Sequence, residues 1–251
     1  MPAKGMSGPW LRTSVVALSL AFCGTAAAAR PLTPHTAKYD IEISVLGGTL
    51  TTVMSAAGPG YMADSVIKPT GLSKLVAHGA IQESSYFVTD ADGVRPRQYR
   101  SIDTLATTDK YVSFDFDWRE KRVTGTVNDE PFRAELDGPV HDRVSIQYQL
   151  MFDLLNGGAS PHYSLLDGDE LKQLNVENIG TKKVKVPFGE FEAIGIQHSK
   201  ESSSRVTTLW CVEELGYLPV LIEQHRDGKL QVRAALTDYD PEAPATQQPA
   251  D

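Results

Sequence analysis

A two-residue alternation of apolar and polar side chains runs through most of this chain and constrains its fold more than any other feature. In the stretch from Phe114 to Trp118, aromatic residues alternate with Asp115 and Asp117. Successive residues of a β-strand point to opposite faces of a sheet, so this pattern predicts strands with one buried and one solvated face. Similar runs begin at Tyr39, Val184, Leu218 and Leu230.

Turn-forming residues between these runs indicate that consecutive strands are joined as hairpins. Asn128-Asp129 separates two runs, and Asp227-Gly228, a strong hairpin signal, separates two more. The residues from Thr207 to Leu236 are therefore expected to form a three-stranded meander. In it, Cys211 is a strand residue and Glu213-Glu214 lies in a turn.

One segment departs from the alternation and predicts a long helix from Asp142 to Leu155. Its apolar residues recur at helical spacing, at Val144, Tyr148, Met151, Phe152 and Leu155. Asp142 is a good N-cap, and Asn156-Gly157-Gly158 is a good stop. We expect this stripe to pack on the concave face of the sheet. A shorter helix is expected over Leu72 to Ala77.

These elements predict a single β-rich domain from residue 33 to residue 239. The fold class is mainly β, an antiparallel, strongly curved sheet or half-open barrel with one long helix packed on it. Residues 240–251 are polar and rich in proline, and they are expected to form a disordered tail.

The first 29 residues have the composition of a secretory signal peptide. Lys4 and Arg12 precede an apolar run from Thr13 to Thr25, and four alanines follow it. The run is too short for a transmembrane helix, so none is expected in the mature chain. Lipidation of Cys23 is not favoured, because the bulky Phe22 precedes it. The predicted location is the periplasm.

The charge excludes some partners. The whole chain has a formal net charge of −8, and its first 29 residues hold two basic residues and no acid, so the remainder has −10. A nucleic-acid partner is not expected, because such proteins need a basic face. Electrostatic docking on an anionic membrane is not expected either.

The residues with chemistry of their own do not form a recognisable catalytic or metal motif. Cys211 lacks a protease signature around it, and it is expected to act as a small apolar residue. Neighbours such as Glu213 and Glu214 point to opposite faces of an extended chain, so they do not flank one bond. None of the six histidines has the spacing of a metal site. Asp115 and Asp117 could form a calcium or sugar site, but a solvated strand face is favoured. No catalytic residue, metal or cofactor is predicted.

Several segments, in order, resemble those of a family of bacterial exported proteins known as domain of unknown function 3108. They are Tyr39 with Gly47-Gly48, Tyr61-Met62-Ala63, Gly71-Leu72, Ser85-Tyr86, Phe116-Asp117-Trp118, Asp142-Arg143-Val144-Ser145 with Tyr148 and Leu150, Val186 to Phe191, and Trp210 with Leu218-Pro219-Val220 and Glu223 to Gly228. The likeness covers about residues 36 to 238. It implies an envelope protein that is mostly β, and it transfers no catalytic residues.

The leading hypothesis is a non-catalytic envelope protein that binds an apolar or amphiphilic ligand, such as a lipid. A short helix cannot cover a large curved sheet, so an apolar pocket is expected between them, with Trp118, Trp210 and Tyr148 as candidate ligand-binding residues. A sheet that rolls up and fills its own interior is the alternative. Two other functions stay open, a hydrolase or sugar-modifying enzyme using acids from separate strands, and a structural partner in an envelope complex.

The leader predicts where the exported chain begins. N-terminal sequencing of the protein recovered from the periplasm should give a start near Arg30, because the alanine run supplies the small residues at a cleavage site. A lipid-modified N-terminus at Cys23 would contradict both the cleavage site and the soluble periplasmic form.

Overall fold

The computed structural model describes residue 1 and residues 29–43, 46–75, 77–201 and 203–241. The leader segment, Cys23 and nearly all of the C-terminal tail lie outside these described residues. The expectations for them stay predictions.

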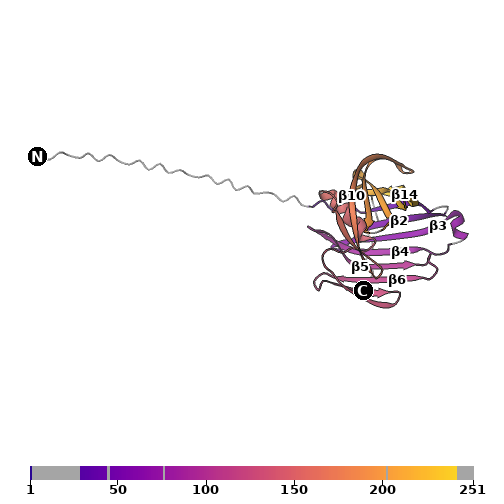
Figure 1. The fold of residues 1–251 in the computed structure, drawn as a ribbon, viewed down its shortest axis with the longest axis horizontal. Helices are drawn as coiled ribbons and strands as arrows, with labels where there is room; N and C mark the ends of the chain where they lie inside the picture. The colour runs from indigo at the N-terminus through magenta and orange to yellow at the C-terminus, as the bar shows by residue number, and fades with distance from the viewer. Residues whose placement is uncertain (2–28, 44–45, 76, 202, 242–251) are drawn as a thin grey trace.

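The described residues form fourteen strands, one α-helix and two short 3-10 helices (Figure 1). The strands are β1 (His35–Ile43), β2 (Leu46–Ala57), β3 (Gly60–Thr70), β4 (Ile81–Asp90), β5 (Gly93–Asp103), β6 (Lys110–Asp117), β7 (Arg122–Val127), β8 (Glu130–Glu135), β9 (His162–Asp167), β10 (Glu170–Val186), β11 (Gly189–Lys200), β12 (Arg205–Val212), β13 (Leu218–Arg226) and β14 (Lys229–Asp240). The helices are α1 (Ser145–Asn156), η1 (Gly71–Leu75) and η2 (Glu213–Leu215).

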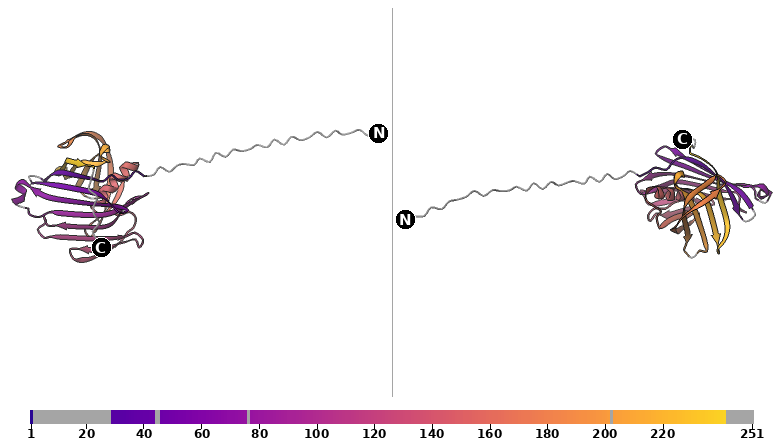
Figure 2. Two further views of the ribbon diagram at one scale, coloured as in Figure 1. Left: turned by 180° about the vertical axis from the view of Figure 1, so that it is seen from behind. Right: turned by 90° about the horizontal axis from the view of Figure 1, so that it is seen from above.

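All fourteen strands belong to one antiparallel sheet, in the order β8-β7-β6-β5-β4-β3-β2-β1-β14-β13-β12-β11-β10-β9. Every pair is adjacent in the chain except β1 with β14. The sheet curves around α1, which lies between the indigo-to-magenta strands and the orange strands (Figure 2). The predicted fold class is confirmed: mainly β, antiparallel, curved, not closed, with one α-helix.

The alternation in the sequence corresponds to the two faces of the sheet. Phe114 and Phe116 of β6 are buried, whereas Asp115 between them is exposed. The predicted hairpin between β7 and β8 is present, and Asn128 and Asp129 have φ angles of 50° and 68°. Two successive positive φ angles are those of the tight turn whose twist matches paired strands.

The long helix begins three residues later than predicted, and its N-cap residue is Val144 and not Asp142. Asp142 nevertheless bonds to the backbone where the helix starts. The Asp142 carboxylate accepts hydrogen bonds from the backbone N–H groups of Val144 and Ser145, at 2.9 and 2.8 Å. It thereby satisfies donors that have no partner in the first turn of a helix. The short helix expected over residues 72–77 is instead the 3-10 helix η1, because so short a segment does not offset the cost of nucleating an α-helix.

The predicted apolar stripe of α1 packs into the main core. Val144, Tyr148, Met151 and Phe152 are buried and Leu155 is partly buried, which confirms the prediction. The ring of Tyr148 stacks on Phe87 of β4 with 5.3 Å between the ring centroids. The other side of α1 packs on β9, β11 and β12 through a smaller cluster that includes Leu150 and Leu154.

The reactive groups of residues 207–232, which are one thiol and two adjacent carboxylates, belong to a buried strand and a turn. Cys211 is fully buried in the smaller cluster, and burial raises the pKa of its thiol well above the usual range. Glu213 and Glu214 lie in η2, which ends at Gly216 in the left-handed conformation. The meander and its turn are therefore as predicted, and the thiol stays protonated.

A single parallel bridge joins His141, in the segment before α1, to Leu165 of β9. The backbone N–H of His141 donates to Ser164 and its carbonyl accepts from Leu166, at 2.9 and 2.8 Å. The His141 ring is buried, and its Nδ1 has no hydrogen-bond partner. Burial lowers the pKa of His141 to about 4, so the ring is neutral in the folded protein.

Replacing Tyr148 by alanine should lower the free energy of unfolding by roughly 2–4 kcal/mol, because a buried, stacked ring is lost from the core. The same change at the exposed Tyr111 is the matched control and should cost less than about 0.5 kcal/mol. Chemical denaturation of both variants measures the difference. Equal losses would contradict the assigned packing of α1.

Acid should destabilise the fold through His141. Burial lowers the pKa of the His141 ring from its ordinary 6.5 to about 4 in the folded state, so the unfolded chain binds the extra proton as the pH falls from 6.5 toward 4. The resulting loss of stability is on the order of 2–3 kcal/mol at pH 4.5 relative to pH 7. Denaturation curves at both pH values should show a smaller loss for His141→Gln than for the native chain. Two equal losses would be inconsistent with a buried neutral His141. Above pH 7 the ring is neutral in both the folded and the unfolded state. The free energy of unfolding should therefore change with pH equally in His141→Gln and in the native chain.

Candidate ligand-binding site

A cavity of about 480 Å³ lies between the N-terminal half of α1 and the concave face of the sheet. Its lining comes from distant parts of the chain, because the pairing of β1 with β14 makes β1 to β3 and β11 to β14 neighbours. The lining residues are Ile41, Leu50, Ile67, Arg143, Ile146, Gln147, Leu150, Tyr163, Leu165, Leu174, Val176, Ile196, His198, Thr207, Leu209, Ile222, Gln224, Val232 and Ala234. Most are apolar, and the volume falls in the range of ligand pockets.

Several apolar side chains of this cavity remain partly accessible to solvent. Leu50 and Ile67 on one side, and Leu209, Ile222 and Val232 on the other, are only half-buried. The 12 residues of α1 span about 18 Å, and the helix packs chiefly on β4 and β5. It therefore leaves apolar surface uncovered inside the curve of the sheet.

Two of the three candidate aromatic residues, Tyr148 and Trp118, lie outside the lining of this cavity. Tyr148 belongs to the packed core and not to the cavity lining. Trp118 lines a separate hollow, where its indole N–H donates to the Pro96 carbonyl at 2.6 Å. The guanidinium of Arg95 lies 5.9 Å from the Trp118 ring centroid.

The third candidate, Trp210, is adjacent in the chain to a residue of the cavity. Leu209 lines the cavity, and alternation along β12 directs Trp210 to the opposite face. There the ammonium of Lys182 lies 3.8 Å from the ring centroid, and the indole N–H donates to Glu223 at 3.3 Å. The structure does not bring Trp118, Trp210 and Tyr148 together, and ligand binding by each stays a prediction.

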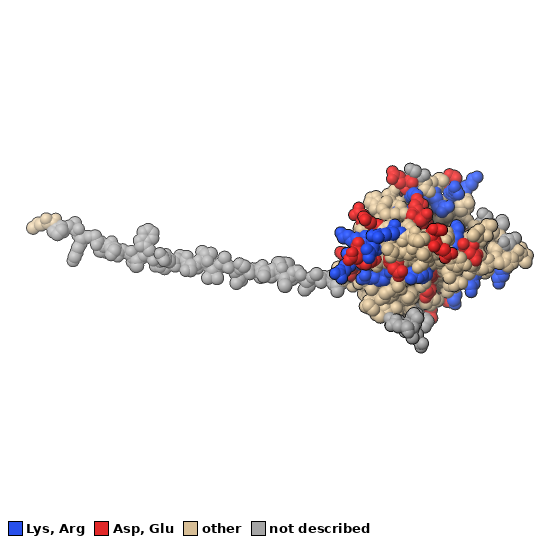
Figure 3. Space-filling view, turned by 90° about the horizontal axis from the view of Figure 1, so that it is seen from below, with Lys and Arg blue, Asp and Glu red and all other residues tan. Residues whose placement is uncertain are grey.

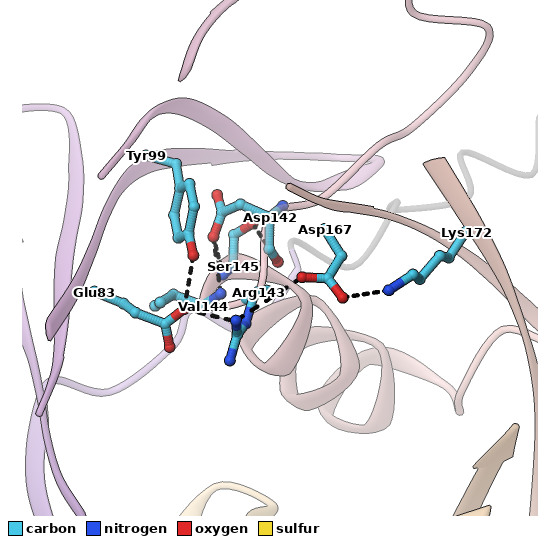
Figure 4. A network of polar contacts seen from close by, with 8 residues as sticks. All are labelled: Glu83, Tyr99, Asp142, Arg143, Val144, Ser145, Asp167 and Lys172. Atoms are coloured by element: carbon cyan, nitrogen blue, oxygen red, sulfur yellow. Dashed lines mark hydrogen bonds and ion pairs between the residues drawn. The ribbon is translucent and has the colours of Figure 1, made fainter. Parts of the chain in front are cut away.

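A polar network adjoins the cavity at the N-terminus of α1 (Figure 4). The Arg143 guanidinium lies between two carboxylates, 3.1 Å from Glu83 and 3.9 Å from Asp167. The Tyr99 hydroxyl also donates to Glu83, at 2.6 Å, and Lys172 pairs with Asp167. Burial, and the nearby Glu83 carboxylate, raise the pKa of Tyr99, so its hydroxyl keeps the proton it donates. The network joins β4, β5, β9, β10 and the start of α1.

Sequence reasoning did not include Glu83, and it named Arg143 only within a family-like segment, without a role. One signal was available for Glu83, since it alternates with Ser85 and Phe87 on a face that the pattern assigns to the interior. A buried carboxylate requires a partner, and that requirement predicts a cation on a facing element. Which cation it is depends on the tertiary arrangement.

The buried acids are engaged in structural bonds. Asp142 accepts a hydrogen bond from the Ser85 hydroxyl at 2.7 Å, in addition to the two backbone N–H groups that it caps. Burial raises the pKa of Asp142, and its bonds to Ser145, Ser85 and Val144 oppose that rise. Since Glu83 is likewise bound to Tyr99 and Arg143, this geometry does not favour the hydrolytic alternative.

Asp115 and Asp117 lie on the solvated face. Asp115 accepts from Gln98 at 3.1 Å, and Asp117 accepts from the backbone N–H groups of Arg119 and Glu120. Within the ranges that the structure describes, no group of three or more His, Cys, Asp or Glu side chains is placed to hold a metal ion. On the face shown in Figure 3, acidic and basic side chains are interspersed.

None of the helices formed by the described residues combines the length and apolar character needed to cross a membrane. A search of curated proteins finds no match. Among solved structures, the fold is similar to the crystal structure of a β-barrel-like protein of domain of unknown function DUF1849 from Brucella abortus. The TM-score is 0.56 and the identity 14%, over 85% of this chain and 99% of that one. At this identity the likeness concerns the fold alone.

The family model for protein of unknown function DUF3108 matches residues 36–232, a range that begins in β1 and ends in β14. It includes every lining residue of the cavity except Ala234, and every residue of the polar network. The chain therefore belongs to the DUF3108 family.

Proposed function

We propose that the protein is a non-catalytic envelope protein that binds one apolar or amphiphilic molecule, such as a lipid, in the cavity between α1 and the sheet. The observation that supports this most is the lining itself. Half-buried apolar side chains from seven strands and α1 face a common space of about 480 Å³. Apolar surface left in contact with water is unfavourable, and an apolar ligand removes that contact.

The cavity has features of a pre-formed site. Its walls belong to strands of one sheet, and all of these strands except the edge strand β9 are paired on both sides, so the sheet holds the walls in place before a ligand arrives. Few polar side chains accompany the apolar ones, among them Gln147, Thr207 and Gln224. A mainly apolar pocket with a few polar groups is typical of sites for small molecules.

The proposed location of this function is the periplasm. The support is the leader of residues 1–29, with its basic start, apolar run and alanines. A carrier of apolar molecules is useful in an aqueous compartment, because such molecules do not cross water readily on their own.

The proposal predicts saturable binding of N-phenyl-1-naphthylamine, a neutral apolar fluorescent probe. Val232→Trp should raise the Kd at least about tenfold, because it places a large ring in the cavity. Gln231→Trp is the matched control. It adds the same ring one residue away, on the opposite face of β14, and should change the Kd less than about twofold. Fluorescence titration measures the affinities, and thermal melts verify that both variants are folded.

The proposal fails if the native protein shows no saturable binding at micromolar probe concentrations. It also fails if the two tryptophan variants bind the probe equally well. Either result would leave the interior as packing space and favour a structural role in an envelope complex.

A further inference from the structure

The concave face of β11, β12 and β13 changes in polarity along the strands. Paired residues form three rows across these strands, because Leu209 pairs with Ile196 and Ile222, Thr207 pairs with His198 and Gln224, and Arg205 pairs with Arg226. Lys200, two residues beyond His198 on β11, extends the third row on the same face. From the interior outward, the rows are Ile196, Leu209, Ile222; His198, Thr207, Gln224; and Lys200, Arg205, Arg226. The face is thus apolar, then neutral polar, then basic.

The basic row lines a second hollow that is adjacent to the cavity. This basic hollow has a volume of about 410 Å³, and it shares with the cavity the residues Leu165, Leu174, His198, Thr207 and Gln224. Its charged lining consists of Lys172, Lys200, Arg205, Arg226 and Asp167, four bases against one acid. The apolar and basic spaces therefore adjoin each other at these five residues.

The two lysines of this lining already have carboxylate partners. Lys172 pairs with Asp167 and Glu170, and Lys200 pairs with Glu170. The positive charge that stays unbalanced is therefore that of the two arginines.

Arg205 and Arg226 face each other directly across β12 and β13. Like charges in opposite positions of an antiparallel pair are destabilising. Neither guanidinium takes part in any ion pair found among the described residues. An anion placed between them would relieve the repulsion, and the guanidinium fork fits a carboxylate or a phosphate.

We propose that the ligand is an anionic amphiphile whose hydrocarbon chain occupies the cavity and whose carboxylate or phosphate head lies between Arg205 and Arg226. This inference rests on the proposed function, since it needs the cavity to accept a hydrocarbon chain. It adds the chemical class of the ligand and its orientation, with the head at the turn ends of the strands. A chain of net charge −8 has no general attraction for anions, so the selectivity comes from this local pair.

The test uses the neutral probe N-phenyl-1-naphthylamine and three ten-carbon competitors, decanoate, decyl phosphate and decanol. With the native protein, both anions should displace the probe at concentrations about tenfold lower than decanol, because only they form charge-assisted hydrogen bonds with arginine. Added salt should narrow this difference, because it screens the exposed charges. Inorganic phosphate alone should displace no probe. The stronger of the two anions identifies the source of the head group, and either order supports the inference.

The variant Arg205→Gln/Arg226→Gln removes the arginine pair and keeps the cavity. It should bind the probe and decanol as the native protein does, whereas the advantage of the anions falls to within about twofold. The matched control Arg119→Gln/Arg133→Gln removes the same charge from β8 and the turn before β7, and it should keep the full advantage.

The outcomes separate the two proposals. No probe binding by the native protein would overturn the proposed function, and this inference with it. Probe binding with equal displacement by decanoate and decanol, or an anion advantage unchanged in Arg205→Gln/Arg226→Gln, would overturn the inference alone. Calorimetric binding of inorganic phosphate as tight as that of decyl phosphate would also overturn it, because the anion site would then act without the cavity.

Discussion

The pairing of β1 with β14 is the contact on which the architecture depends. It brings together residues such as Lys38 and Asp238, 200 positions apart in the sequence, and converts two meanders into one continuous sheet. Because of it, Ile41 and Ala234 lie side by side on the inner face, and both line the cavity. Such a distant pairing costs chain entropy, which the long ladder of backbone hydrogen bonds and the buried apolar surface offset.

The sheet is curved, and the helix of 12 residues covers only part of its concave face. The covered part forms the core, and the uncovered part lines the cavity. One side of α1 packs Tyr148 and Phe152 into the main core, and that packing fixes the helix against β4 and β5. The buried Asp142 and the pair of Arg143 with Glu83 hold the N-terminus of the helix beside the cavity. The space that remains is lined by β1 to β3 and by β9 to β14. In this account the same contacts that stabilise the fold keep the cavity open.

Local chemistry made much of the fold predictable from the sequence. Alternating residues such as Phe114 and Phe116 identified strands, Asn128-Asp129 identified a hairpin, and Asp142 identified the start of the helix region. These signals depend on neighbours within a few residues. The pairing of β1 with β14 has no such signal, because it depends on which strands remain unpaired after the hairpins have formed.

The site was less predictable for the same reason. Trp118 and Trp210 were candidate ligand-binding residues because they are large and aromatic. Trp118 lines a separate hollow, and strand alternation places Trp210 on the face opposite Leu209. The apolar, polar and basic rows of the concave face exist only in the register of β11, β12 and β13. The facing arginines are separated by 21 positions in the sequence, so no local pattern reveals them.

A crystal structure with bound 10-bromodecanoate would test the central claim most directly, because anomalous scattering locates the bromine. The account predicts a bromine peak inside the cavity, near Ile222 and Leu209, with the carboxylate toward Arg205 and Arg226. A bromine peak only on the outer surface, or an interior in which Leu209, Ile222 and Val232 have closed the space, would contradict it.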